Sequence, residues 1–156
     1  MKKRQTLKIA VVLLLLAGTL ASCEEKEKYP TEISFTEYSL TGTSCQWTNL
    51  NYDDRDGNVK VINSNKELEN FIACSDGEFP KIDFSTYTLL LVSGTTYQNI
   101  ETMNLSLEQH SANKYQLNVE IRLGEGDMMD TWTLALLVKK IGRNSRVSAN
   151  VEIIQN

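Results

Sequence analysis

A strict alternation of apolar and polar residues is the feature that most restricts how this chain folds. Between residues 115 and 123 every second position is apolar, and the residues concerned are Tyr115, Leu117, Val119, Ile121 and Leu123. Successive side chains of a β-strand point to opposite faces, so this pattern predicts a strand with one face in a core and the other in water. Shorter stretches with the same period occur at 33–35, 103–107 and 147–153.

Two further segments, 86–92 and 131–141, are apolar on both faces, which predicts central strands covered on both sides. The predicted links between strands are short and polar, at 93–95, 111–113, 124–130 and 142–145. Because a parallel crossover needs a dozen or more residues, short links predict antiparallel neighbours. We therefore expect a mostly β fold of the α+β class: an antiparallel meander of about five to seven strands with one short helix packed against it.

The helix is predicted after Ser64. Ser64 and Glu67 have the spacing of a capping box, in which the serine oxygen and the glutamate carboxylate accept the free N–H groups of the first turn. Leu68, Phe71 and Ile72 then form one apolar stripe at helical spacing. This pattern predicts a helix that ends near Cys74.

The first 23 residues have the order of an export signal. Lys2, Lys3 and Arg4 precede an apolar run, and small residues lead to Cys23. The uninterrupted apolar run, 9–16, is about half the ~20 residues that span a hydrocarbon core. Leu-Ala-Ser-Cys resembles the site at which bacterial lipoproteins are cleaved and acylated, which implies a signal peptide at 1–22 and a bilayer anchor on Cys23.

Cleavage after residue 22 would leave 134 of the 156 residues, enough for one domain. The charged stretch 24–28 contains no apolar residue, and we expect residues 23–30 to form a lipidated cysteine and tether, followed by a single β-rich domain at 31–156. This mature chain would hold twelve basic and twenty acidic residues, a net charge of −8, which argues against nucleic acid as a partner.

Cys45 and Cys74 remain after Cys23 is acylated. Export favours disulfides, so we expect a bond between them, with two separate buried thiols as the alternative. Cysteine catalysis needs a nearby base, and the chain has one histidine, His110, in a predicted turn. No serine-nucleophile or phosphate-loop motif is present. We therefore expect no catalytic residue, no cofactor and no metal site, and a chain that is not an enzyme.

Three loop features remain open. Asp53 to Asn58 is rich in carboxylates but does not fit the EF-hand pattern, which leaves a weak calcium loop or a plain turn. Met128 and Met129 lie in a polar loop, where we expect them to cap the end of the sheet, or else to form an adaptable contact with a partner. A basic cluster lies at the last predicted hairpin and consists of Lys139, Lys140, Arg143 and Arg146. The cluster either contacts lipid headgroups or an acidic partner, or it is an ordinary solvated turn.

Two resemblances extend this interpretation. The acid-rich stretch after Cys23 resembles the tract of surface-displayed lipoproteins from Bacteroides-type bacteria. Four stretches, 61–64, 67–71, 80–85 and 89–94, resemble the protease complex subunit family typified by the PrcB C-terminal domain, over about residues 59–154. The chain departs from that family after Gly94, where Thr95-Thr96-Tyr97 replaces a glycine-rich segment. The resemblance implies an accessory subunit and provides no catalytic residue.

These observations predict a non-catalytic envelope lipoprotein, anchored in the bacterial outer membrane through acylated Cys23. Its β-rich domain is expected to bind an unidentified envelope protein, and the family resemblance implies association with a protease. Surface display is expected, with a periplasm-facing anchor as the alternative. One alternative function is a small-ligand or lipid carrier with a cavity in the sheet, lined by Leu89, Leu105, Val119 and Trp132. Another is a protease inhibitor that uses the loop 124–130.

Overall fold

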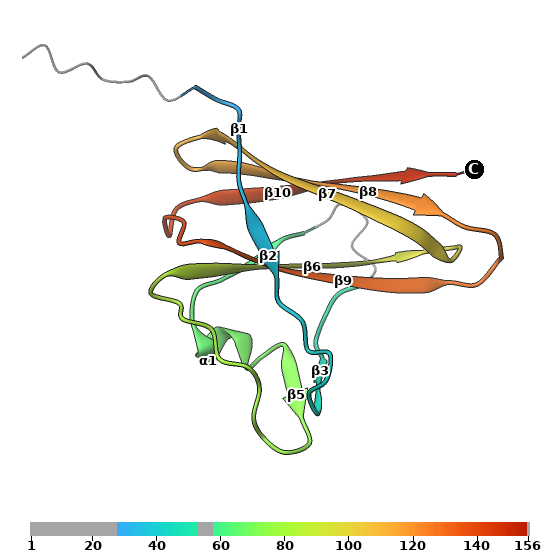
Figure 1. Ribbon diagram of the computed structural model, residues 1–156, viewed down its shortest axis with the longest axis horizontal. Helices are drawn as coiled ribbons and strands as arrows, with labels where there is room; N and C mark the ends of the chain where they lie inside the picture. The colour runs from blue at the N-terminus through green and yellow to red at the C-terminus, as the bar shows by residue number, and fades with distance from the viewer. Residues whose placement is uncertain (1–27, 53–57, 156) are drawn as a thin grey trace, which may run out of the picture.

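Two β-sheets stacked face to face form the body of the protein (Figure 1). The computed structural model describes residues 28–52 and 58–155. Sheet A has the strand order β1-β7-β8-β10 and sheet B the order β2-β9-β6-β4, while β3 and β5 pair separately. The elements are β1 (Thr31–Glu32), β2 (Phe35–Glu37), β3 (Cys45–Trp47), β4 (Lys60–Ile62), α1 (Asn65–Leu68), β5 (Ile72–Cys74), β6 (Tyr87–Thr96), β7 (Ile100–Ser111), β8 (Lys114–Leu123), β9 (Asp130–Lys139) and β10 (Arg146–Ile154).

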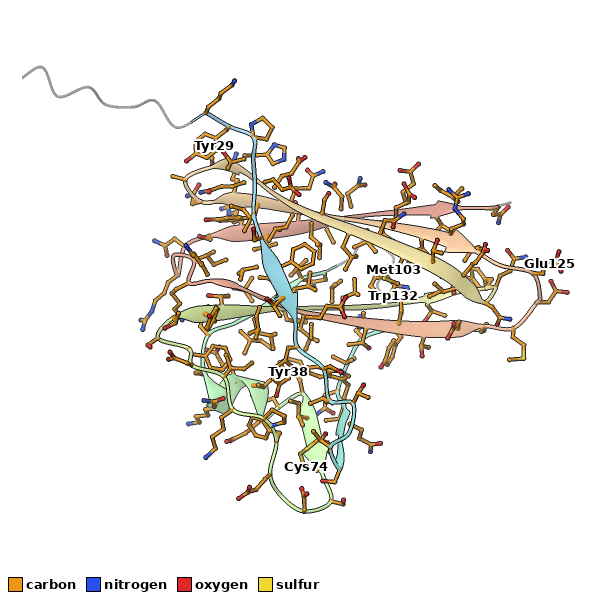
Figure 2. The ribbon with its side chains drawn as sticks, in the orientation of Figure 1. Tyr29, Tyr38, Cys74, Met103, Glu125 and Trp132 are labelled. Atoms are coloured by element: carbon orange, nitrogen blue, oxygen red, sulfur yellow. A yellow bond between two sulfur atoms is a disulfide. The ribbon has the colours of Figure 1, made fainter. Side chains whose placement is uncertain are left out.

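The space between the two sheets holds the main hydrophobic core. The alternating residues of β8 that were expected to face inward do so, with Leu117, Val119 and Ile121 at 1% exposure or less. Sheet B contributes Leu90, Val92, Trp132, Leu136 and Val138 to this core. Figure 2 shows Met103 and Trp132 in this space between the sheets.

A second core lies on the other face of sheet B. There Leu89 and Leu91 of β6 pack against Leu68 of α1 and Ile72 of β5, in the layer drawn below the sandwich (Figure 1). Both faces of β6 are therefore covered, as the continuous apolar run of this strand predicted. The mostly β fold with one short helix packed against it is confirmed.

The helix begins where expected but ends earlier. Ser64 is its N-cap, and its hydroxyl accepts the N–H of Glu67 at 3.2 Å, while the Glu67 carboxylate accepts the N–H of Asn63 at 2.7 Å. The expected continuation to Cys74 is wrong, because α1 ends at Leu68 and Ile72–Cys74 forms β5 instead. Antiparallel pairing of β5 with β3 and burial of Ile72 in the second core outweigh the helical spacing of the apolar residues.

The strand order differs from the expected meander. Only the turn between β7 and β8 joins neighbours in one sheet, whereas the chain changes sheets between β6 and β7, between β8 and β9, and between β9 and β10. As a result β10 returns to sheet A and pairs parallel with β8. The rule that short links join antiparallel neighbours fails here because it assumes that consecutive strands stay in one sheet. In the part of the chain that is described, no helix is long and apolar enough to cross a membrane.

Candidate functional site

The two ends of the sandwich carry different kinds of residue. Strands β6 to β10 run along its long axis, so their connections gather at the two ends (Figure 1). The chain enters at one end, where Thr31 pairs with Gln109, and we call this the tether end. The opposite end, formed by the connections 97–99 and 124–129, is the distal end.

Large apolar side chains are exposed at the distal end. Tyr97 is 63% exposed, Met128 70% and Met129 67%, and Ile153 near the C-terminus is 48% exposed. Tyr97 and Met129 each lie one residue beyond the pair Thr96–Asp130, which closes the ladder between β6 and β9. They therefore occupy facing positions at the end of sheet B. The expectation that Met128 and Met129 cap the sheet is wrong, because both side chains point largely into solvent.

A cavity of about 150 Å³ opens beside these residues, where the edge of sheet B meets β10. Its lining is Tyr52, Gly94, Thr95, Tyr97, Trp132, Val151 and Ile153. Gly94 and Trp132 are cross-strand partners, and a Cβ atom on Gly94 would lie 2.5 Å from Cζ2 of the indole. The absence of a side chain at Gly94 is what leaves room for the indole.

Hydrogen bonds hold the two distal connections together. Gly124 donates its N–H to the carbonyl of Asn99 at 2.9 Å, and the Asn99 side chain donates to the carbonyl of Glu125 at 3.4 Å. The buried hydroxyl of Thr96 donates to the carbonyl of Gln98 at 2.7 Å. Figure 2 shows Glu125 at the tip of this end. The exposed methionines are thus presented by a loop that is attached to its neighbour.

The electrostatic character of the distal end is acidic. The segment from Gly124 to Asp130 contains three carboxylates, Glu125, Asp127 and Asp130, and no basic residue. The apolar side chains of Tyr97, Met128 and Met129 therefore lie among negative charges. Sequence reasoning missed Tyr97 and Ile153, although an aromatic residue in the polar turn 97–99 was a usable signal.

A wider cleft of about 470 Å³ lies under sheet B between β2, β3 and β9. Tyr38 and Trp47 line it, with ring centroids 6.0 Å apart in an edge-to-face arrangement. The Tyr38 hydroxyl donates to the carbonyl of Pro80, and burial raises the pKa of this phenol to about 12. Tyr38 is consequently neutral at physiological pH and serves as a packing residue with one hydrogen bond.

Cys45 and Cys74 form the expected disulfide, and they are cross-strand partners in β3 and β5. Figure 2 shows Cys74 in the layer below the sandwich. Asp76 lies close to both sulfur atoms, and hydrogen bonding, first from Ser44 and then from the backbone of Glu78, lowers the pKa of this carboxyl. Because the two sulfurs are bonded to each other, this group offers no thiolate to a metal ion.

The other residues considered as chemical groups lie apart. His110 is at the tether end, with Nε2 3.0 Å from the carboxylate of Glu108. Leu89 packs in the second core, whereas Leu105, Val119 and Trp132 belong to the first, so these four residues do not line one cavity. The carrier hypothesis loses the cavity on which it depended. Cys23, the expected acylation site, and the carboxylates of the loop 53–57 lie outside the described residues.

Comparisons with known proteins give no family, since no family model, no curated protein and no solved structure matches the chain. The resemblances to the PrcB-type subunit family and to Bacteroides-type lipoproteins therefore stay predictions.

Proposed function

We propose that this protein is a non-catalytic envelope lipoprotein, anchored through acylated Cys23, that presents the distal end of its sandwich to a protein partner. Outer-membrane location with surface display is part of the proposal, and the PrcB-type resemblance makes a secreted or envelope protease the first partner to test. The observation that carries the proposal is the position of the exposed apolar residues at the end of the sandwich opposite to the tether.

This placement matters because an anchored domain can meet only partners within reach of its free surface. The tether leads into β1 at one end, and Tyr97, Met128 and Met129 lie on connections at the other (Figure 1). A binding surface at the distal end would therefore face away from the bilayer. An anchor at that end would instead have buried these residues against lipid.

The chemistry of the distal end favours a protein as the partner. Tyrosine and methionine are enriched in protein interfaces, and methionine adapts its shape to a partner through three rotatable bonds. The surrounding carboxylates, Glu125, Asp127 and Asp130, would complement a basic rim around an apolar groove. This combination describes a partner with an apolar recess bordered by lysine or arginine.

Affinity purification from detergent-solubilised envelopes of the native host tests the proposal. The full chain carrying Tyr97→Ser, Met128→Ser and Met129→Ser should lose a stoichiometric partner that wild type retains. Tyr87→Ser is the matched control, because Tyr87 is 40% exposed and lies at the tether end, opposite Lys139. Recovery of no stoichiometric partner with wild type, or equal loss in the control, would contradict the proposal.

The anchor is tested separately. Mass spectrometry of the N-terminal peptide from the native host should find cleavage before Cys23 and acyl chains on its sulfur and amine. Protease treatment of intact cells should then degrade the domain if it is surface-displayed and spare it if it faces the periplasm. A bare Cys23 thiol, or an uncleaved leader, would refute the anchored model.

A second candidate function, protease inhibition, is favoured by the exposed loop from Gly124 to Asp130 and its attachment to Asn99. Inhibitors of this kind present a well-held loop to the protease active site. Met128→Ala together with Met129→Ala should then abolish inhibition of a protease that wild type inhibits, while Tyr87→Ser should leave it intact. Titration against proteases of each catalytic class, with no inhibition by wild type, would exclude this candidate.

A further inference from the structure

Basic side chains gather at the tether end. The connections and strand ends there carry five exposed basic residues: Lys114, Lys139, Lys140, Arg143 and Arg146. Neither the turn 111–114 nor the segment 139–146 contains an acidic residue. The two segments are adjacent, because the N–H of Arg146 donates to the carbonyl of Asn113 at 2.8 Å. This basic end stands out in a chain whose mature form has a net charge of −8.

These cations are available to an external partner. The ion pair between His110 and Glu108 at this end involves none of the five. Lys140 has internal partners, since its Nζ donates to Asn63 Oδ1 at 2.8 Å and lies 6.0 Å from the centroid of the Phe84 ring. Within the described residues, the side chains of Lys114, Lys139, Arg143 and Arg146 make no hydrogen bond or ion pair. The test varies three of these residues and measures the reactivity of Lys114.

A cleft of about 390 Å³ lies between β1 and the basic segment. Lys139 and Lys140 line it together with apolar groups, and the full lining is Glu32, Ile33, Ser34, Gln109, Tyr115, Lys139, Lys140 and Ile141. The cleft combines two lysines and one carboxylate, Glu32, with an apolar floor, where Ile33, Tyr115 and Ile141 belong to or pack against the main core. A headgroup phosphate with the adjoining glycerol and first methylenes has the matching chemistry.

The tether places this end close to a bilayer. Lys28 is five positions after Cys23, and five extended residues span at most about 17 Å. Charges act over a screening length of about 8 to 10 Å at physiological salt, so Lys28 would lie within about two screening lengths of the surface. The chain then enters the tether end three residues later, where Thr31 pairs with Gln109. A lysine or arginine near an anionic surface strengthens binding by a factor of about five.

We propose that the tether end is a membrane-docking face: its basic residues bind the anionic headgroups of the bilayer that holds Cys23, and the cleft beside β1 receives a headgroup phosphate. The inference rests on the proposed anchor and adds a fixed orientation to it. Docking holds the sandwich upright, with Tyr97, Met128 and Met129 directed away from the bilayer.

The test attaches the mature chain, residues 23–156, to vesicles through its one free thiol, Cys23, using a maleimide phospholipid. Acetylation rates of individual lysines are then measured by mass spectrometry on vesicles of phosphatidylcholine alone and of phosphatidylcholine with 30 mol% phosphatidylglycerol. Lys114 and Lys139 should react at least fivefold more slowly on the anionic vesicles, and 0.5 M NaCl should remove the difference. Lys60 and Lys66 should react equally on both.

A charge-matched pair of variants completes the design. The variant with Lys139→Gln, Arg143→Gln and Arg146→Gln should abolish the protection of Lys114, whereas Lys60→Gln, Lys66→Gln and Lys81→Gln should preserve it. Equal rates on neutral and anionic vesicles would overturn the proposal, as would equal protection by 10 mM inorganic phosphate without vesicles. Because the anchor is supplied chemically, these outcomes do not depend on whether Cys23 is acylated in the host or on the distal partner.

Discussion

Replacing Gly94 by alanine tests how closely the sandwich is packed at its distal end. The added Cβ would lie 2.5 Å from Cζ2 and 2.7 Å from Cε2 of Trp132, whereas carbon atoms in good contact are about 3.5 to 4 Å apart. The indole must therefore shift by about 1 Å, although it is only 8% exposed and packed in the main core. Overpacking of this kind lowers the free energy of unfolding by about 1 to 3 kcal/mol. Alanine also restricts the unfolded chain more than glycine does, and this smaller stabilising effect is already included in that range.

Urea unfolding of the mature chain, followed by circular dichroism, measures this change. Gly124→Ala is the matched control, because its Cβ would meet no atom closer than 3.6 Å, and its free energy of unfolding should stay within about 0.5 kcal/mol of wild type. In a Trp132→Phe background the smaller ring relieves the clash, so Gly94→Ala should cost less than about 0.5 kcal/mol there. Wild-type stability of Gly94→Ala, or an equal cost in both backgrounds, would refute the packing argument.

Three further changes have expected outcomes. Cys45→Ala together with Cys74→Ala removes the disulfide, which closes a loop with a sequence separation of 29. This change should lower the free energy of unfolding by about 3 kcal/mol, as measured by urea titration. An equal unfolding midpoint of wild type with and without reductant would contradict this. Ser64→Ala removes the oxygen that accepts the Glu67 N–H and should cost about 1 kcal/mol, while the exposed Ser75→Ala should cost little in the same assay. Hydrogen bonds, first from Ser85 and then from Thr86, hold the pKa of the Asp83 carboxyl below its usual 3.8. The ionised carboxylate therefore stabilises the folded state at pH values above the unfolded-state pKa. This contribution disappears as the pH falls through the lower folded-state pKa. Asp83→Asn should therefore flatten the dependence of the urea midpoint on pH between 5 and 2, and an unchanged slope would argue against it.

Much of the architecture was predictable because it depends on local patterns. The alternation in β8 and the apolar runs in β6 and β9 correctly identified strands and their buried faces. The start of α1 at Ser64 was predictable because capping involves residues three positions apart. Its end was not, because the fate of Ile72 depends on pairing with a strand more than twenty residues earlier.

The candidate site was predictable only in part. Met128 and Met129 were singled out as apolar residues in a polar loop, but their exposure depends on where that loop lies relative to the rest of the sandwich. Ile153 was missed because it follows a strand pattern locally, and its exposure depends on where β10 lies in the sandwich. Tyr97 was missed although it stands as an aromatic residue in a polar turn. The basic cluster was visible in the sequence, but its position beside the tether required the fold.

The sequence by itself determined that the long segments β6 to β10 are strands, which of their faces are apolar, and which two cysteines were available to pair, because these properties follow from the side chains of neighbouring residues. Only the tertiary structure decided that consecutive strands alternate between two sheets, that β10 runs parallel to β8, and that basic and apolar residues occupy opposite ends. The physical reason is that packing two sheets against each other couples residues far apart in the chain, and no local pattern records which sheet a strand joins.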